Sequence, residues 1–268
     1  MVTILVVLLV IGAPIGVAIG MSSAVSMICM IPADVSFATS AQRIFAGSNS
    51  FSLIAIPFFI LAGNIMNNGG IATRLVNCAK VISGRMPGAL AQSNVVANML
   101  FGAISGSGAA AAAAMGGTIG PLEEKEGYDK NYSTAVNVAS APVGMLIPPS
   151  NTMIVYSSVA GSVSIAALFM AGYIPGLLWG GAVMILAGIM AKKRGYQAEQ
   201  RVPVKVALKT FWQAIPSLLL IVIVIGGILG GIFTATEGSA IAVVYATVLS
   251  LIYLSLIHIS EPTRLQLI

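Results

Sequence analysis

The sequence predicts an all-α integral membrane protein, built as a polytopic bundle of helices in a lipid bilayer. Of its 268 residues, 57% are hydrophobic and 8% are charged, whereas a soluble domain carries about 25% charged residues. Its 29 glycines and 12 prolines are typical of membrane-spanning helices, in which both residues are more frequent than in soluble helices. The apolar runs are also continuous, whereas the strands of a membrane barrel alternate apolar and polar residues.

The net charge of +5 does not indicate a nucleic-acid partner, because much of it lies in one loop predicted between residues 192 and 212. That loop carries Lys192, Lys193, Arg194, Arg201, Lys205 and Lys209. Basic loops of membrane proteins stay on the cytoplasmic side, so we expect this loop in the cytoplasm. Cys29 and Cys78 have no CxxC or metal-ligand spacing and are expected to be free thiols.

The first apolar run, residues 2–31, would extend roughly 45 Å as one helix, which is too long for one upright crossing. Either one tilted helix or two short helices broken near Gly12-Ala-Pro14 would fit, and the break favours two. The run lacks the basic start and small-residue cleavage site of a signal peptide, so we expect it to stay in the membrane. Residues 33–50 mix polar and apolar side chains and predict an arm at the membrane interface.

Residues 51–66 predict a short span that contains Pro57 and ends at Asn67-Asn68-Gly69-Gly70. A polar helix carrying Arg74, Lys80 and Arg85 follows it. Further spans are predicted at about residues 133–160, 163–191, 213–234 and 237–255. Residues 123–130 are strongly polar and are expected to lie in water. Glu237, at the start of the last span, fits a helix-capping carboxylate or an ion-pathway residue, and the cap is favoured.

The central apolar segment, residues 89–121, is interrupted by Ser105-Gly106-Ser107-Gly108. It is either a full span or a re-entrant helical hairpin that enters and leaves on one side. Counting spans back from the basic loop places residues 123–130 in the cytoplasm, and the basic helix before residue 89 should also be cytoplasmic. Both placements hold only if the segment crosses an even number of times, which favours the hairpin.

A second interruption lies at Pro148-Pro149, within the span predicted at residues 133–160. Proline has no N–H group and pushes the preceding residue out of helical conformation, so this helix must break there. A broken backbone at membrane depth is tolerated only where it is buried in protein or lines a cavity. We therefore predict that the hairpin tip and the broken helix meet in a binding site near the bilayer midplane.

The residues of this predicted site offer hydroxyl groups, backbone carbonyls and free helix ends. They are Ser105, Gly106, Ser107, Gly108, Pro148, Pro149, Ser150, Asn151 and Thr152. Such oxygens suit Na⁺, for which Ser105, Ser107 and Ser150 are the expected ligands, and a helix N-terminus favours an anion. The alternatives are close helix packing by small residues at the tip and a plain proline kink capped by Ser150.

The sequence does not predict an enzyme. A serine nucleophile between glycines would need a base, and the single histidine, His258, lies close to the C-terminal end. No Gly-Lys-Ser/Thr phosphate loop follows a glycine run, so ATP hydrolysis is not expected either.

Several motifs occur together and in order: the run from Leu53 to Gly63, Phe101-Gly-Ala-Ile-Ser-Gly-Ser107, Gly127-Tyr128-Asp129, and Ile147-Pro-Pro-Ser150 followed by Tyr156. In this combination the chain resembles the large permease subunit of tripartite ATP-independent periplasmic (TRAP) transporters. The resemblance covers residues 1–254.

The resemblance implies a Na⁺-coupled secondary transporter of the bacterial or archaeal inner membrane, with an elevator-type fold and no organic cofactor. It implies import of an organic anion, such as a C4-dicarboxylate, a sialic acid or a similar carboxylate, delivered by a periplasmic solute-binding protein. A small four-helix membrane subunit is the other implied partner. The hairpin and the broken helix paired with it would hold one Na⁺ and part of the substrate.

Two rivals to this interpretation follow from the same residues. The nearer one is a single-component Na⁺/carboxylate carrier of related architecture that needs no periplasmic receptor. The other is a channel or a purely structural membrane subunit.

The second hairpin and broken helix of that family lie later in its chain, beyond this sequence. We therefore expect residues 1–254 to be the N-terminal part of the transporter membrane domain, with half of the site missing and no transport by this part alone. Residues 255–268 are expected to be a non-native tail, because Ser255 to Arg264 resembles translated sequencing-adapter sequence.

Overall fold

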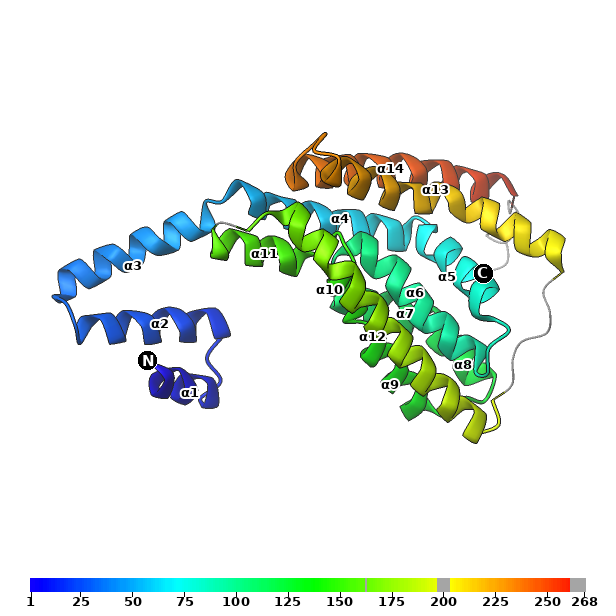
Figure 1. Cartoon of the computed structure of the whole chain (residues 1–268), viewed down its shortest axis with the longest axis horizontal. Helices are drawn as coiled ribbons and strands as arrows, with labels where there is room; N and C mark the ends of the chain where they lie inside the picture. The colour runs from blue at the N-terminus through cyan, green and yellow to red at the C-terminus, as the bar shows by residue number, and fades with distance from the viewer. Residues whose placement is uncertain (162, 197–202, 261–268) are drawn as a thin grey trace. The chain divides into compact units, whose positions relative to one another are not determined.

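The computed structural model describes residues 1–161, 163–196 and 203–260, and the described residues form helices and no strand. Figure 1 shows the helices in chain order. The chain divides into two compact units, Met1–Ser50 and the part from Phe51 onward. The all-helical fold class is confirmed.

The first unit consists of α1 (Val2–Val10), α2 (Ile15–Ile28) and α3 (Ala33–Ser48). The chain turns between α1 and α2 at Gly12, whose φ of +87° is readily adopted only by glycine. Two short helices, rather than one tilted helix, are therefore confirmed. That α3 lies at a membrane interface stays a prediction.

The second unit contains the remaining helices, and a 3-10 turn, η1 (Phe51–Ile54), leads into the first of them. They are α4 (Ala55–Asn68), α5 (Ile71–Ser83), α6 (Ala89–Ser105), α7 (Gly108–Thr118), α8 (Gly120–Lys125), α9 (Lys130–Ser140), α10 (Val143–Leu146), α11 (Asn151–Ala160), α12 (Ile165–Lys193), α13 (Val204–Leu229) and α14 (Ala235–Ser260).

Length and composition identify the membrane spans. Within the described chain, 4 helical segments are long and apolar enough to cross a bilayer: η1 with α4, α12, α13, and α14 as far as Tyr253. The count rises to 5 if α9–α11, bent by 47° at its break, is one span. The protein is thus a multi-pass membrane protein.

The start of α13 differs from the span predicted at residues 213–234. The helix begins at Val204 and ends at Leu229, so Lys205 and Lys209 lie on it rather than in a loop. Lysine is a good helix former, and charge alone therefore did not mark the helix boundary.

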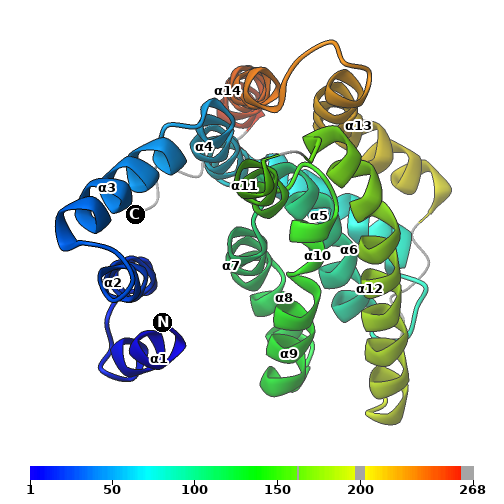
Figure 2. The same ribbon diagram turned by 60° about the vertical axis from the view of Figure 1, so that its left-hand side comes forward.

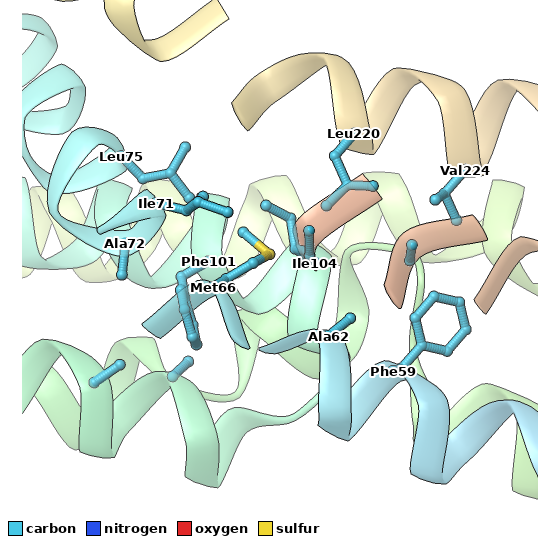
Figure 3. Packing of buried hydrophobic residues seen from close by; sticks show 14 of the residues in the cluster. Phe59, Ala62, Met66, Ile71, Ala72, Leu75, Phe101, Ile104, Leu220 and Val224 are labelled. Atoms are coloured by element: carbon cyan, nitrogen blue, oxygen red, sulfur yellow. The ribbon is translucent and has the colours of Figure 1, made fainter. Parts of the chain in front are cut away.

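The second unit buries an apolar cluster between α4, α5, α6, α13 and α14 (Figure 3). Phe59 and Met66 come from α4, Leu75 from α5, Phe101 from α6 and Leu220 from α13. Lipid is as apolar as these side chains, so close packing rather than removal from water holds membrane helices together. The cluster therefore fixes α4 and α13 against the α5–α6 layer.

Residues 89–121 fold as a hairpin. The chain turns at Gly106, and α7 returns alongside α6; Figure 2 shows the two helices from a second side. Asn94, near the start of α6, lines the same cavity as Gly116 of α7 and Glu123 of α8, so the two ends of the segment lie together. The helical hairpin is confirmed, and that it enters and leaves the membrane on one side stays a prediction.

The polar segment at residues 123–130 is only partly exposed. Asp129 is exposed and forms an ion pair with Arg194 at 3.2 Å. Glu123 and Tyr128, by contrast, are 1% and 8% exposed. The prediction that the whole segment lies in water is wrong for these two residues, because α6 and α9 cover Glu123, and α6 and α12 cover Tyr128.

Two glycines allow the broken helix to cross the hairpin at backbone contact. A Cβ atom added to Gly144 of α10 would lie 2.6 Å from the Cα atom of Gly102 in α6. Side chains larger than hydrogen at either position would push the two helices apart. Small residues at such crossings are the usual means of close approach in membrane proteins.

We expect Gly102→Ala to destabilise the protein by about 1–3 kcal/mol, because the added methyl group must displace backbone rather than a flexible side chain. Thermal unfolding in detergent measures the change. Gly117→Ala is the matched control, since a Cβ atom there meets nothing within 4 Å. Equal melting temperatures for the two variants would contradict the close crossing.

Candidate functional site

The hairpin tip is built by three consecutive residues that end one helix and start the next. Ser105 is the last residue of α6, and Gly106 follows with φ +61°. Ser107 is extended and caps α7, because its Oγ accepts a hydrogen bond from the Ala110 N–H at 3.3 Å. The tip is therefore a defined turn and not a frayed end.

The broken helix has a second turn of the same kind. After α10 the chain is extended at Ile147, and the peptide bond between Pro148 and Pro149 is cis. Ser150 is also extended and caps α11, accepting from the Met153 N–H at 3.4 Å and donating to the Met145 carbonyl. Both interruptions thus place a serine N-cap at a new helix start.

The two turns are in direct contact. The Asn151 N–H donates to the Gly106 carbonyl at 3.2 Å, and the Asn151 amide Nδ2 donates to the Ser105 carbonyl at 3.3 Å. A Cβ atom on Gly106 would lie 3.0 Å from the Pro149 carbonyl oxygen. The expected meeting of the hairpin tip and the broken helix is therefore observed.

Most of the predicted site residues gather at this contact. Ser105, Gly106, Pro148, Pro149 and Ser150 are buried, and Ser107 and Asn151 are half-buried. Gly108 instead packs against the end of α9, where its Cβ atom would lie 2.9 Å from the Ala141 carbonyl oxygen, and Thr152 is exposed on α11. That these residues bind an ion or a substrate stays a prediction.

The oxygen atoms at the contact are of the type that Na⁺ prefers. The Ser105 Oγ lies 3.4 Å from the Ser107 backbone N and O, and the Asn151 Oδ1 is buried without a hydrogen-bond partner. The Ser150 hydroxyl already forms two hydrogen bonds with the backbone: it donates to the Met145 carbonyl and accepts from the Met153 N–H. No group of three His, Cys, Asp or Glu side chains suited to a metal ion occurs in the described chain. That Na⁺ binds to these neutral oxygen atoms stays a prediction.

Sequence reasoning missed a buried polar network below the tip. The Asn98 Nδ2 lies 2.9 Å from Asn94 Oδ1, 3.0 Å from Asn137 Oδ1 and 2.8 Å from Ser140 Oγ. The spacing of Asn94 and Asn98, four residues apart in an apolar segment, places both on one helix face and was the available signal. The network joins α6 to α9.

Sequence reasoning also missed Gly63 of α4, which packs against Ser105 at the hairpin tip. A Cβ atom on Gly63 of α4 would lie 2.8 Å from the Ser105 Cβ. This glycine lies in the motif from Leu53 to Gly63, and it lets α4 pack directly against the end of α6.

Glu237 is a capping residue. Its Oε2 accepts hydrogen bonds from the Thr234 N–H at 2.7 Å and from the Thr234 Oγ1 at 2.9 Å. These contacts fix the first turn of α14 and confirm the interpretation as a cap.

Multiple apolar helices, with two interrupted helices joined through their backbones, define a polytopic helical membrane protein. The chain belongs to the family described as "Tripartite ATP-independent periplasmic transporter, DctM component", whose model matches residues 2–265.

Curated relatives of this chain include proteins named as TRAP transporter large permeases. The protein YgiK of Salmonella typhimurium is 53% identical over 247 residues, which cover 92% of this chain and 57% of YgiK. The C4-dicarboxylate TRAP transporter large permease protein DctM of Vibrio cholerae is 40% identical over 240 residues, 89% of this chain and 52% of that protein. The sialic acid TRAP transporter large permease protein SiaM of Vibrio cholerae is 38% identical over 239 residues, 88% and 54% of the two chains. The chain thus spans about half the length of these relatives.

Substitution of Gly106 tests the contact. Gly106→Ala should destabilise the protein by about 2–4 kcal/mol, since left-handed backbone costs alanine about 1–2 kcal/mol and the methyl group also meets the Pro149 carbonyl. Thermal unfolding measures the loss. Gly161→Ala is the control, because Gly161 has φ +70° with nothing within 4 Å of its Cβ position. If both variants lost equal stability, the tip would not be held against the break.

Proposed function

We propose that this chain is the N-terminal part of the large permease subunit of a TRAP secondary transporter that imports an organic carboxylate together with Na⁺. The membrane would be the inner membrane of a bacterium or archaeon. A periplasmic solute-binding protein would deliver the substrate, and a small membrane subunit would complete the complex. Membership of the DctM family supports the class of transporter.

The hydrogen-bonded contact between the hairpin tip and the broken helix carries this proposal. Four helix ends converge there: α6 and α10 end at the contact, and α7 and α11 begin at it. Helix C-termini expose carbonyl oxygens and partial negative charge, whereas N-termini expose N–H groups and partial positive charge. The same place can therefore attract a cation and an anion without any charged side chain.

Coupling between the two ligands would follow from this arrangement. A Na⁺ ion bound to the carbonyl and hydroxyl oxygens of the tip would hold the α7 N-terminus in position for a carboxylate. The bound carboxylate would in turn strengthen Na⁺ binding, because linkage between two binding sites is reciprocal.

The substrate class rests on the relatives. Two of them are named as C4-dicarboxylate and sialic acid permeases. The neutral contact, lined by backbone groups, suits the carboxylate group that these substrates share. The rest of each substrate would be recognised by other parts of the permease.

The proposal is tested in the intact permease that contains this sequence, reconstituted into liposomes with its small membrane subunit and binding protein. Ser107→Ala or Ser150→Ala should weaken apparent Na⁺ affinity by about 2–10-fold, the loss expected for one neutral ligand. Uptake of labelled substrate against external Na⁺ concentration measures the effect.

Ser164→Ala is the matched control, because Ser164 caps α12 through the same type of bond to Ala167, at 3.4 Å. It should lower stability like the other two variants but leave the Na⁺ dependence of uptake unchanged. Unaltered Na⁺ dependence in the Ser107 and Ser150 variants would exclude the ion site, and uptake without the binding protein would favour a single-component carrier.

A further inference from the structure

The hairpin has a second polar region at the end away from its tip. A cavity of about 340 Å³ lies there between α6, α7, α8 and α9. Its lining includes Asn94, Gly116, Glu123, Glu124, Lys130 and Ser133. The Gly102–Gly144 backbone contact lies between this region and the tip, so the cavity is separate from the proposed ion and substrate site.

Glu123 is the unusual residue of this cavity. It is 1% exposed, and both of its carboxylate oxygens are buried without a hydrogen-bond partner. Its neighbours on the same segment, Glu124 and Glu126, are exposed. A buried carboxylate without a partner is costly unless a cation or a proton neutralises it.

The groups nearest to Glu123 are neutral. The Asn94 Nδ2 and the Ser133 Oγ are also buried and lack partners in the structure, and they approach the carboxyl group from α6 and α9. Among the described residues no basic side chain forms an ion pair with Glu123, and Lys130, which lines the cavity, is exposed.

The titratable groups around Glu123 include one cation, Lys130, which is exposed and forms no ion pair with Glu123 among the described residues. From α8, the following loop and α9 they are Glu124, Glu126, Tyr128, Lys130 and Tyr132, and α6 and α7 contribute none to the cavity. The carboxylates add negative charge, and the tyrosines are neutral at ordinary pH.

We propose that Glu123 is a proton-binding site, at which the carboxyl group is held as a neutral acid between α6, α8 and α9. As an acid, its O–H can donate to Ser133 and its carbonyl oxygen can accept from Asn94, so a small side-chain adjustment satisfies every group. Loss of the proton creates a buried anion, to which Asn94 and Ser133 offer neutral hydrogen bonds but no positive charge, so the carboxylate is favoured to move into the cavity. Proton release therefore loosens α8 from α6 and α9.

The electrostatics agree with this geometry. Burial raises the pKa of Glu123 from 4.5 to about 7, against smaller lowering effects of Ser133 and Asn94, and the nearby Glu126 raises it further. A folded-state pKa above the unfolded value means that the folded protein binds the extra proton. The contribution of Glu123 to the free energy of unfolding is therefore greatest below pH 4.5, and it is lost as the pH rises to about 7 and beyond.

Melting temperature as a function of pH tests the proposal on the full chain in detergent. The unaltered protein should melt about 3–8 °C lower at pH 8 than at pH 5.5. Glu123→Gln should remove most of this dependence, because its amide is neutral at both pH values. Glu124→Gln, the exposed neighbour on α8, should keep it. Equal pH dependence in the Glu123→Gln variant and the unaltered protein would overturn the proposal.

A direct titration covers the case in which Glu123→Gln fails to fold. Carboxyl ¹³C NMR of the unaltered chain labelled at glutamate should show one resonance that titrates near pH 7, apart from those of the exposed glutamates. If all glutamate resonances titrated near their ordinary pKa of about 4.3, Glu123 would be ionised where it is buried, and the proton site would be excluded.

Discussion

The hydrogen bond from the Asn151 N–H to the Gly106 carbonyl is the constraint on which the second unit depends. Each interrupted helix leaves backbone groups that lipid cannot satisfy, at a cost of several kcal/mol per group. Here each break supplies partners for the other, since Asn151 also reaches the Ser105 carbonyl with its side chain. Neither the hairpin tip nor the broken helix would be stable in a membrane alone.

That mutual dependence explains where the small residues lie. Gly63 lets α4 pack against Ser105, and Gly102 and Gly144 let α6 and α10 touch through their backbones. Gly108 similarly leaves space for the Ala141 carbonyl. A side chain at any of these positions would separate the helices and lengthen the hydrogen bonds at the tip. These four glycines allow the contact because they have no side chain, whereas Gly106 is required for its left-handed backbone conformation.

The two ends of the hairpin use different chemistry. At the tip, polarity comes from backbone groups and neutral side chains. At the opposite end, Asn94, Asn98 and Asn137 form a buried network, and Glu123 places an ionisable group next to it. The Gly102–Gly144 contact lies between these two regions.

Much of this protein was predictable from local sequence. Composition and continuous apolar runs defined a helical membrane protein, Pro148-Pro149 required a broken helix, and Ser105 to Gly108 required a turn. The predicted break near Gly12 was also correct, since glycine and proline act on the backbone within one or two residues. The family resemblance agrees with the DctM family match.

The contacts between residues that are distant in the sequence were decided by the tertiary structure. Periodicity could not show that Asn151 bonds to Gly106, or that Glu123, in a segment of charged residues, is buried against Asn94 and Ser133. The boundary of α13 was misjudged because lysine fits a helix as well as a loop. Sequence alone therefore determined where the helices break and that the protein is a helical membrane protein, because these properties depend on each residue and its neighbours. Which breaks meet, and which polar groups are enclosed, depends on residues from several helices at once and was settled only by their packing.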